Sequence, residues 1–477
     1  MTLSPSRPLP RADAPAAPPP TRRHPPLPAA RDTGIDLVRA LCLLAILVLH
    51  GLQVSATVGE AGPVLEYATR GATWYPPVTW ALQVMPVFFV IGGFAGLVAH
   101  RRSLARGGTA TAFVAGRVHR LLLPAVVTIG VVGLGLALLA GAGTPVELVR
   151  EIGLRYSEPL WFLGVFLACQ ALLPAQLALH ARAPWALFAG LAGAAVGIDL
   201  LRGATGLDAI GYANLAAVWL ALQQLGFLLA DGYLDLLSVS VRRAAGIAAV
   251  AVLVLVIAAG PWSADLIAHM NPPTTALLLV GLAQTLLISL LRGPLTALSE
   301  RPGVAACTRF VTAHSMTIYL WNLPVLLLAA GASAEVAMLH AGLLLEPSGL
   351  AWWMTRPAWL LGTVLATGGV AWLLGGIERR RAPQPTDSPR RALHGVLLGL
   401  AAVLLLLLAG TTPLTAALAV CLMMIALLRI TAPAPRRHRE PLDTAKRRGR
   451  GDPSVKAGEI RDESDTLRLD GTMARPA

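Results

Sequence analysis

Apolar stretches of about 20 residues recur along this chain of 477 residues and place the first limit on its fold. Residues 37–58, 121–140 and 351–376 are three examples. A helix of that length crosses the hydrocarbon core of a bilayer, which is about 30 Å thick. Charged residues make up 14% of the chain, whereas a soluble globular protein has about 25%. The chain is therefore predicted to be an all-α polytopic membrane protein.

Twelve candidate transmembrane helices can be placed in the sequence. An outer-membrane barrel is excluded, because its strands are only about 10 residues long and alternate in polarity. The candidate helices lie near residues 35–58, 79–99, 121–140, 160–179, 185–201, 212–230, 244–260, 274–291, 310–330, 357–376, 392–409 and 412–429.

The distribution of Lys and Arg predicts the orientation. With a cytoplasmic N-terminus, the inner segments before the C-terminal tail carry 21 of these residues and the outer loops carry 5. Cytoplasmic loops of membrane proteins are enriched in Lys and Arg, so both termini are predicted to be cytoplasmic and the protein to lie in the cell membrane. The net charge of +13 does not indicate a nucleic-acid partner, because the basic residues are not gathered in one patch.

Composition divides the chain into five segments. Residues 1–32 form a Pro-rich cytoplasmic tail and residues 430–477 a basic tail, and both are predicted to be disordered. Between them lie a ten-helix domain (33–378), a basic linker (379–391) and a two-helix hairpin (392–429). The hairpin has almost no polar residue inside the membrane, so we expect it to serve packing or a partner contact. The four cysteines form no CxxC pair, and no metal site is predicted.

The first helix carries the strongest candidates for chemistry. Arg39 and His50 are 11 residues apart, which places them on one helix face and about 16 Å apart along the axis. Imidazole is the usual general base near neutral pH. Asp36, three residues before Arg39, is expected to pair with it. The alternative is that Arg39 reaches toward the interface and that His50 only hydrogen-bonds a neighbouring helix.

A second candidate, Arg117-Val118-His119-Arg120, precedes the third span on the predicted cytoplasmic side. Residues three apart share a helix face, so Arg117 and Arg120 could form a fork for phosphate groups. The alternative is ordinary positive-inside anchoring, which Arg101, Arg102 and Arg106 fit better.

Other polar and small residues lie within or beside the spans. The Gly92-Gly93 pair interrupts the second span and would allow a close approach of helices. Intramembrane amides such as Gln170 more often join helices than bind ligands. Possible contacts to an acceptor or to the active site are Glu158 and Trp161 at the mouth of the fourth span, and Tyr319 and Asn322 in the ninth.

Five motifs occur in an order that resembles the type-3 membrane acyltransferase family, whose members O-acylate sugars, glycans and natural products. They lie within residues 33–376, the ten helices that precede the basic linker. The motifs are Gly34-Ile35-Asp36-Leu37-Val38-Arg39-Ala40 followed by His50, Pro86-Val87-Phe88-Phe89-Val90-Ile91-Gly92-Gly93-Phe94, Arg117-x-x-Arg120, Leu160-Trp161-Phe162-Leu163 and Ile318-Tyr319-Leu320-Trp321.

The resemblance implies an O-acyltransferase that uses acyl-CoA from the cytoplasm, with acetyl or another short chain as the acyl group. It implies no bound cofactor, and a hydroxyl acceptor on a carbohydrate, a lipid-linked molecule or a natural product. His50 would be the essential base, Arg39 its motif partner in a catalytic set with Asp36, and Arg117 and Arg120 the donor contacts. Membrane lipids would be its further partners.

One position departs from the family pattern. Where such enzymes often have Tyr-Leu-x-His, this chain has Tyr319-Leu320-Trp321-Asn322. Asparagine cannot take a proton, so either His50 works alone or the activity is altered or lost. From the residues alone, a transporter or flippase and a non-catalytic membrane scaffold remain alternatives. A transporter would be favoured by inverted repeats, and no convincing repeat is found between the halves of the sequence.

Overall fold

The computed structural model of the protein describes residues 32–432, apart from 60–61, 261, 341–345 and 380–382. Within these residues, eleven helices are long and apolar enough to cross a bilayer, or up to twelve if the bent pair α10 and α11 is one span. The protein is thus an all-α polytopic membrane protein, as predicted. The tails predicted to be disordered lie almost entirely at 1–31 and 433–477, outside the described residues.

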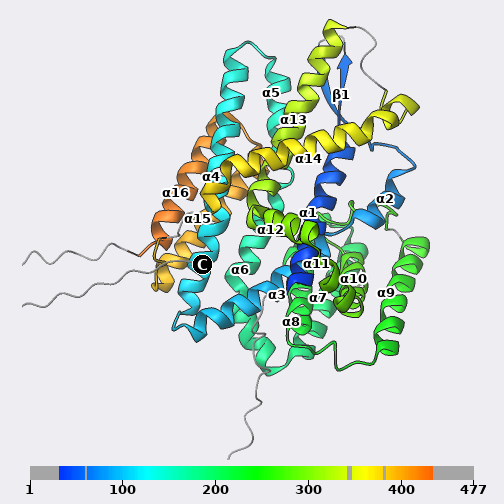
Figure 1. Ribbon diagram of the computed structural model, residues 1–477, viewed down its shortest axis with the longest axis vertical. Helices are drawn as coiled ribbons and strands as arrows, with labels where there is room; N and C mark the ends of the chain where they lie inside the picture. Colours follow the sequence, from blue (N-terminus) through cyan, green and yellow to red (C-terminus); the bar gives the residue numbers. More distant parts are fainter. Residues whose placement is uncertain (1–31, 60–61, 261, 341–345, 380–382, 433–477) are drawn as a thin grey trace, which may run out of the picture. The chain divides into compact units, whose positions relative to one another are not determined.

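The elements follow one another along the chain as drawn in Figure 1. The first half contains α1 (Thr33–Gln53), β1 (Val54–Gly59), β2 (Gly62–Tyr67), α2 (Tyr75–Leu82), α3 (Met85–Ala105), α4 (Ala110–Gly141), α5 (Val146–Ser157), α6 (Leu160–Arg182), α7 (Pro184–Thr205), η1 (Asp208–Ala213) and α8 (Asn214–Ala230). The second half contains α9 (Val239–Ala259), α10 (Thr275–Leu290), α11 (Arg292–Ser299), α12 (Pro302–Ala313), α13 (Ser315–Leu339), α14 (Leu350–Arg379), α15 (Pro389–Ala409) and α16 (Pro413–Ile430).

Each of the twelve predicted spans falls on helical segments, but the first prediction, 35–58, extends beyond the end of α1 at Gln53. Residues 54–58 leave α1 and form strand β1, which pairs antiparallel with β2 from Val54↔Tyr67 to Gly59↔Gly62. The β-branched residues Val54, Thr57 and Val58 favour an extended backbone. This β-hairpin marks one end of the bundle, called here the hairpin end, and the start of α1 marks the other, called the arginine end.

Three other spans are broken rather than straight, and one of them, 310–330, begins in α12 and is interrupted at His314 before α13. The predicted helix at 79–99 is divided at Gln83, where α2 ends, and Pro86 then lies in the first turn of α3, where its missing N–H costs nothing. Gly92 and Gly93 do not interrupt α3, contrary to the prediction. The predicted span at 274–291 corresponds to α10, which bends by 68° into α11.

α1 and α8 are the most enclosed of the spanning helices, and α3 packs closely on α8. A Cβ atom on Gly93 would lie well inside 3.0 Å of the Gln223 carbonyl, and one on Gly226 would do the same at the Val90 carbonyl. The two glycines therefore let the two backbones touch, which confirms the predicted close approach at Gly93. In a bilayer such contacts drive helix association, because lipid and protein are equally apolar.

A partly buried ion pair joins three helices at the arginine end of the bundle. Arg101 of α3 donates two hydrogen bonds to Asp231, which follows α8, and His180 of α6 also contacts this carboxylate at 3.3 Å. Burial alone would raise the pKa of Asp231, but the hydrogen bonds to His180 and Arg101 outweigh it and lower the pKa below its ordinary value. Arg101 thus joins helices and is more than a surface anchor.

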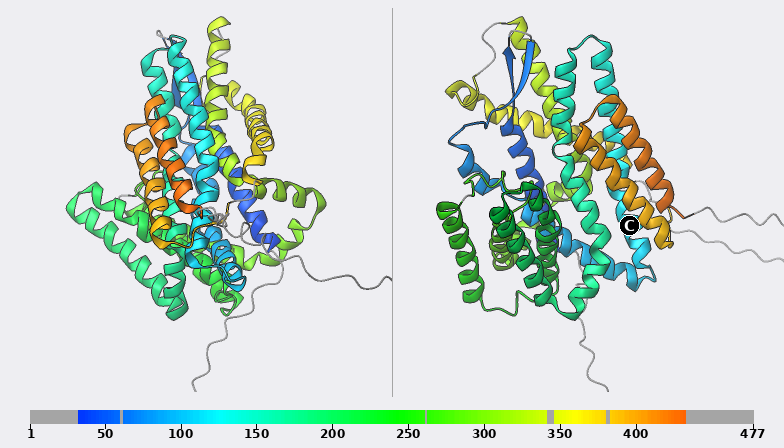
Figure 2. Two further views of the ribbon diagram at one scale, coloured as in Figure 1. Left: turned by 90° about the vertical axis from the view of Figure 1, so that its left-hand side faces the viewer. Right: turned by 180° about the vertical axis from the view of Figure 1, so that it is seen from behind.

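The C-terminal hairpin of α15 and α16 packs against α4 and α6, and Figures 1 and 2 show these segments side by side. At its turn, the buried hydroxyl of Thr411 lies 2.7 Å from that of Ser157. Ser157 ends α5 and immediately precedes Glu158. The C-terminal hairpin therefore packs against the helix bundle, which is one of the two roles predicted for it, and it supports the bend between α5 and α6.

Replacing Gly93 or Gly226 by Ala should push α3 and α8 apart and lower the melting temperature of the detergent-solubilised protein. Overpacking of this kind costs about 1–3 kcal/mol. Thermal unfolding, followed by loss of the monodisperse gel-filtration peak, measures the effect. Gly135→Ala in α4, where the added Cβ meets nothing within 4 Å, is the matched control. Equal melting temperatures for all three variants would contradict the close packing of α3 on α8.

Candidate functional site

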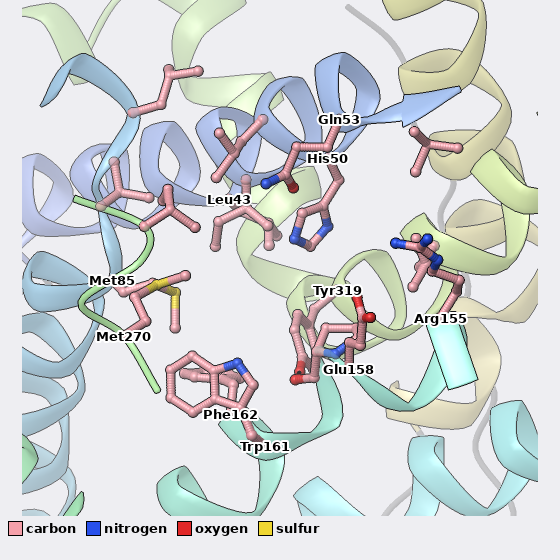
Figure 3. Close-up of a pocket in the computed structure, with 18 of the residues that line it drawn as sticks. Leu43, His50, Gln53, Met85, Arg155, Glu158, Trp161, Phe162, Met270 and Tyr319 are labelled. Carbon is pink, nitrogen blue, oxygen red and sulfur yellow. Dashed lines mark hydrogen bonds between the residues drawn. The ribbon is translucent and has the colours of Figure 1, made fainter. Parts of the chain in front are cut away.

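His50 lies in the last turn of α1 and lines a cavity of about 250 Å³ near the hairpin end, called here the histidine cavity. The walls come from α1, α2, α3, α5, α6, α13, the β-hairpin and the loop before α10. Figure 3 shows that the wall is divided by polarity, with Leu43, Met85 and Met270 on one side of His50 and Arg155 and Glu158 on the other. An imidazole thus lies between an apolar surface and a charged one.

Asn322 of α13 contacts His50 directly. Its amide nitrogen lies 2.8 Å from Nδ1 of the imidazole, and its side chain is 2% exposed. A hydrogen bond at Nδ1 fixes the ring orientation and leaves Nε2 as the second ring nitrogen. The residue that departs from the family pattern is therefore in the site, where it holds the histidine. The sequence had indicated only a possible contact to the acceptor or to the active site.

The charged side of the histidine cavity is built by α5, α6 and the β-hairpin. The Tyr67 hydroxyl donates to Oε2 of Glu158, and the Arg155 guanidinium stacks on the Tyr67 ring, 3.8 Å from its centroid. Burial, aided by the Glu158 carboxylate, raises the pKa of Tyr67 above its ordinary value. These three residues also line a neighbouring groove of about 350 Å³ with Arg70 and Glu151, called here the polar groove.

Two aromatic residues predicted as site contacts line the same cavity. Tyr319 donates a hydrogen bond of 2.5 Å to the carbonyl of Pro159, the residue that precedes α6. Trp161 packs on Trp219 of α8, with ring centroids 5.6 Å apart. Trp161 therefore lies inside the bundle and is not only an interfacial anchor. Glu158, Trp161, Tyr319 and Asn322 are thus brought together around His50, as the sequence had suggested.

Arg39, Arg117 and Arg120 together line two further cavities nearer the arginine end, of about 500 and 570 Å³, called here the first and second arginine cavities. Arg39 also forms the predicted pair with Asp36, at 3.5 Å. Asp36 therefore lies beside the arginine cluster, whereas His50 is about three helical turns from Arg39 and lines another cavity. The predicted catalytic set is divided between the two places.

The second arginine cavity and the histidine cavity share part of their lining. Phe88 of α3 and Ser315 and Met316 of α13 line both. The Phe88 ring meets Phe162 and Phe166 edge-on, with centroids 5.1 and 5.9 Å apart. Cavities with a common wall therefore follow one another from the arginine cluster to His50 and on to the polar groove.

Sequence reasoning missed four residues of these cavities. Arg102 and Arg106 had been assigned to anchoring, yet they line the first arginine cavity together with Arg117. Because they lie four residues apart at the end of α3, the two arginines share a helix face, and this spacing could have indicated a joint binding role. No pattern in the sequence indicated Tyr67 or Arg155 as site residues, because only the fold of the β-hairpin brings Tyr67 beside Arg155 and Glu158.

The arrangement is suited to group transfer from an anionic donor. Five guanidinium groups line one cavity and can bind phosphates, and an imidazole in its neutral form can accept a proton from a hydroxyl. Among the described residues, no group of three or more His, Cys, Asp or Glu side chains has the geometry of a metal site.

Comparison with known proteins agrees with these features. The family model described as an acyltransferase domain matches residues 32–375. A comparison with curated proteins and another with solved structures found no significant match. The match to the acyltransferase family model covers well over half of the chain and includes His50, the arginine cluster and Asn322. The chain therefore belongs to the type-3 membrane acyltransferase family.

Proposed function

We propose that this membrane acyltransferase transfers an acyl group, acetyl or another short chain, from acyl-CoA to a hydroxyl of a carbohydrate, a lipid-linked molecule or a natural product. The observation that carries the proposal is the row of neighbouring cavities, each of which shares lining residues with the next, between the arginine cluster, His50 and the polar groove. The arginine end faces the cytoplasm, in agreement with the Lys and Arg count of the loops, and both termini lie on that side.

The donor enters from the arginine end. The phosphates of CoA are bound by Arg117 and Arg120, with Arg39, Arg102 and Arg106 around the same cavity. The pantetheine arm passes Phe88 and places the thioester beside His50. The acyl chain then lies against the apolar side of the histidine cavity, near Leu43 and Met85, where burial stabilises it by about 0.8 kcal/mol per methylene.

The acceptor enters from the polar groove. Tyr67, Arg155 and Glu158 border both this groove and the histidine cavity, so they supply hydrogen-bonding partners for a polyhydroxylated molecule. Entry from opposite ends keeps the thioester away from water until a hydroxyl reaches His50, which suppresses hydrolysis.

His50 performs the proton transfers. Nε2 takes the proton of the acceptor hydroxyl while the hydroxyl oxygen attacks the thioester carbonyl carbon. The C–S bond breaks, the imidazolium returns the proton to the CoA thiolate, and an ester and free CoA result. For Nε2 to be the base, Nδ1 must carry the proton of the neutral imidazole. The Asn322 side chain stabilises that tautomer when its amide oxygen, rather than its nitrogen, faces Nδ1. Rotation about one side-chain bond exchanges these two atoms of the amide.

His50→Ala should reduce acyl transfer by about 10²- to 10⁴-fold, the usual contribution of a general base. The assay follows radiolabel from acetyl-CoA and longer acyl-CoAs into lipid, glycan and small-molecule fractions of membranes supplied with an extract of the source cells. His394→Ala, an exposed histidine of α15, is the control and should retain wild-type transfer. If wild-type membranes transfer label from none of these donors, the transport or scaffold alternative is favoured.

Arg117→Gln and Arg120→Gln should raise the donor KM with a smaller change in kcat, because charge-assisted hydrogen bonds to phosphate are lost before the chemical step. Each such bond contributes about 1.5–3 kcal/mol, which corresponds to roughly ten- to hundredfold in KM. Arg243→Gln, at an exposed arginine of α9, controls for a loss of general positive charge. An unchanged donor KM in both variants would return Arg117 and Arg120 to an anchoring role.

Asn322→Leu should lower kcat by about fivefold, the value of a net hydrogen bond of ~1 kcal/mol, with little change in either KM. It should also alter the pH dependence of kcat, because the imidazole loses the group that selects its tautomer. Asn322→His, which restores the residue common in the family, should regain transfer. A leucine variant with wild-type kcat and pH profile would show that His50 needs no partner.

A further inference from the structure

Gln170 of α6 is a buried amide with no hydrogen-bond partner among the described residues. The residue is 1% exposed, and neither its nitrogen nor its oxygen is bonded. The amide nitrogens of Gln223, Gln224 and Gln284 all donate to carbonyl oxygens, although the amide oxygens of Gln224 and Gln284 have no partner among the described residues. Gln223, for example, donates to the Cys169 carbonyl and to Oε1 of Gln176. Gln170 is therefore not engaged in joining helices, the role that the sequence had favoured.

An unsatisfied amide inside a membrane protein is costly. Leaving a buried polar group without a partner destabilises the fold by about 1–3 kcal/mol, whereas Leu at this position would carry no such cost. Gln170 lines the second arginine cavity, so a molecule in that cavity lies against its side chain. A buried polar group without a partner requires an explanation, and at this cavity wall a bound ligand supplies one.

The position of Gln170 defines which part of a ligand it can reach. Phe162, Phe166 and Gln170 are spaced four residues apart and share one face of α6. Phe162 lines the histidine cavity, while Phe166 and Gln170 line the second arginine cavity. Gln170 lies about 12 Å along the helix axis from Phe162, beside the cavity that separates the arginine cluster from His50.

We propose that Gln170 binds an amide of the pantetheine arm of the donor. The inference rests on the proposed function, in which CoA phosphates lie at the arginines and the thioester at His50, so that the arm must cross the second arginine cavity. That arm is a chain whose polar groups include secondary amides. A glutamine side chain offers both a donor and an acceptor, which matches the C=O and N–H of an amide.

The recognition explains how the site selects a CoA thioester over other acyl compounds. The arginines recognise phosphate, which is common to all nucleotides, and His50 acts on the thioester. Gln170 adds a contact that a nucleotide without the arm cannot make. Because both of its polar atoms are without protein partners, a ligand lacking an amide at this place leaves them unsatisfied and binds more weakly.

The experiment measures dissociation constants of the full-length, detergent-solubilised protein for two probes, free CoA and adenosine 3′,5′-bisphosphate, which keeps phosphates but lacks the arm. Gln170→Leu should weaken CoA binding by about tenfold and leave binding of the bisphosphate unchanged. Arg117→Gln should weaken both probes. The melting temperature of Gln170→Leu without ligand should equal or exceed that of the wild type, because an unsatisfied amide is removed.

Gln223→Leu is the matched control for stability, since the amide nitrogen of Gln223 donates two hydrogen bonds from α8 to α6, and the melting temperature of this variant should fall. If Gln170→Leu unfolds or loses stability as Gln223→Leu does, Gln170 is a packing residue and the proposal is wrong. Equal CoA affinity of wild type and Gln170→Leu would overturn it while leaving the proposed function intact. Failure of the wild type to bind CoA at all would overturn both.

Discussion

The absence of water in the bilayer core is the constraint on which this structure depends. A polar side chain there must find a partner inside the bundle, because lipid offers none. Buried polar groups accordingly gather between helices: Arg101 with Asp231 and His180 at one end, and Asn322 with His50 nearer the other. The outer helices α7 and α9, of which only 11% of the most apolar window is buried, also place their polar side chains against neighbours: Asp199 accepts from Asn214 and Thr275, and Arg242 donates to Ser289.

The same constraint separates structural polar groups from functional ones. Gln223 and Gln224 are engaged by carbonyl oxygens or side chains of neighbouring helices, so they hold the bundle together. Gln170 instead lines a cavity and has no hydrogen-bond partner among the described residues. The arginine cluster also lines cavities, but Arg39 pairs with Asp36 and Arg117 donates to the Ala95 carbonyl, so the role proposed for the cluster follows from its position and charge.

The C-terminal hairpin shows how a segment outside the matched family region contributes to the site. The family model ends at residue 375, whereas α15 and α16 begin at Pro389 and Pro413. Their turn contacts Ser157 through Thr411, one residue before Glu158. The contact supports the bend between α5 and α6, where Glu158 accepts a hydrogen bond from Tyr67, and fixed positions of polar side chains favour binding in one orientation.

The sequence by itself determined the membrane class, the approximate positions of the helical spans and the candidates at His50, Arg39, Arg117 and Arg120. These follow from periodicity and from the cost of polar groups in hydrocarbon, which act locally along the chain. Only the tertiary structure decided that Asn322 holds His50, that Tyr67 meets Glu158, that Arg102 and Arg106 join the arginine cluster, and that Gln170 is without a partner. Each of these depends on which helix faces share a cavity, and helix packing sets that over sequence separations that no local pattern encodes.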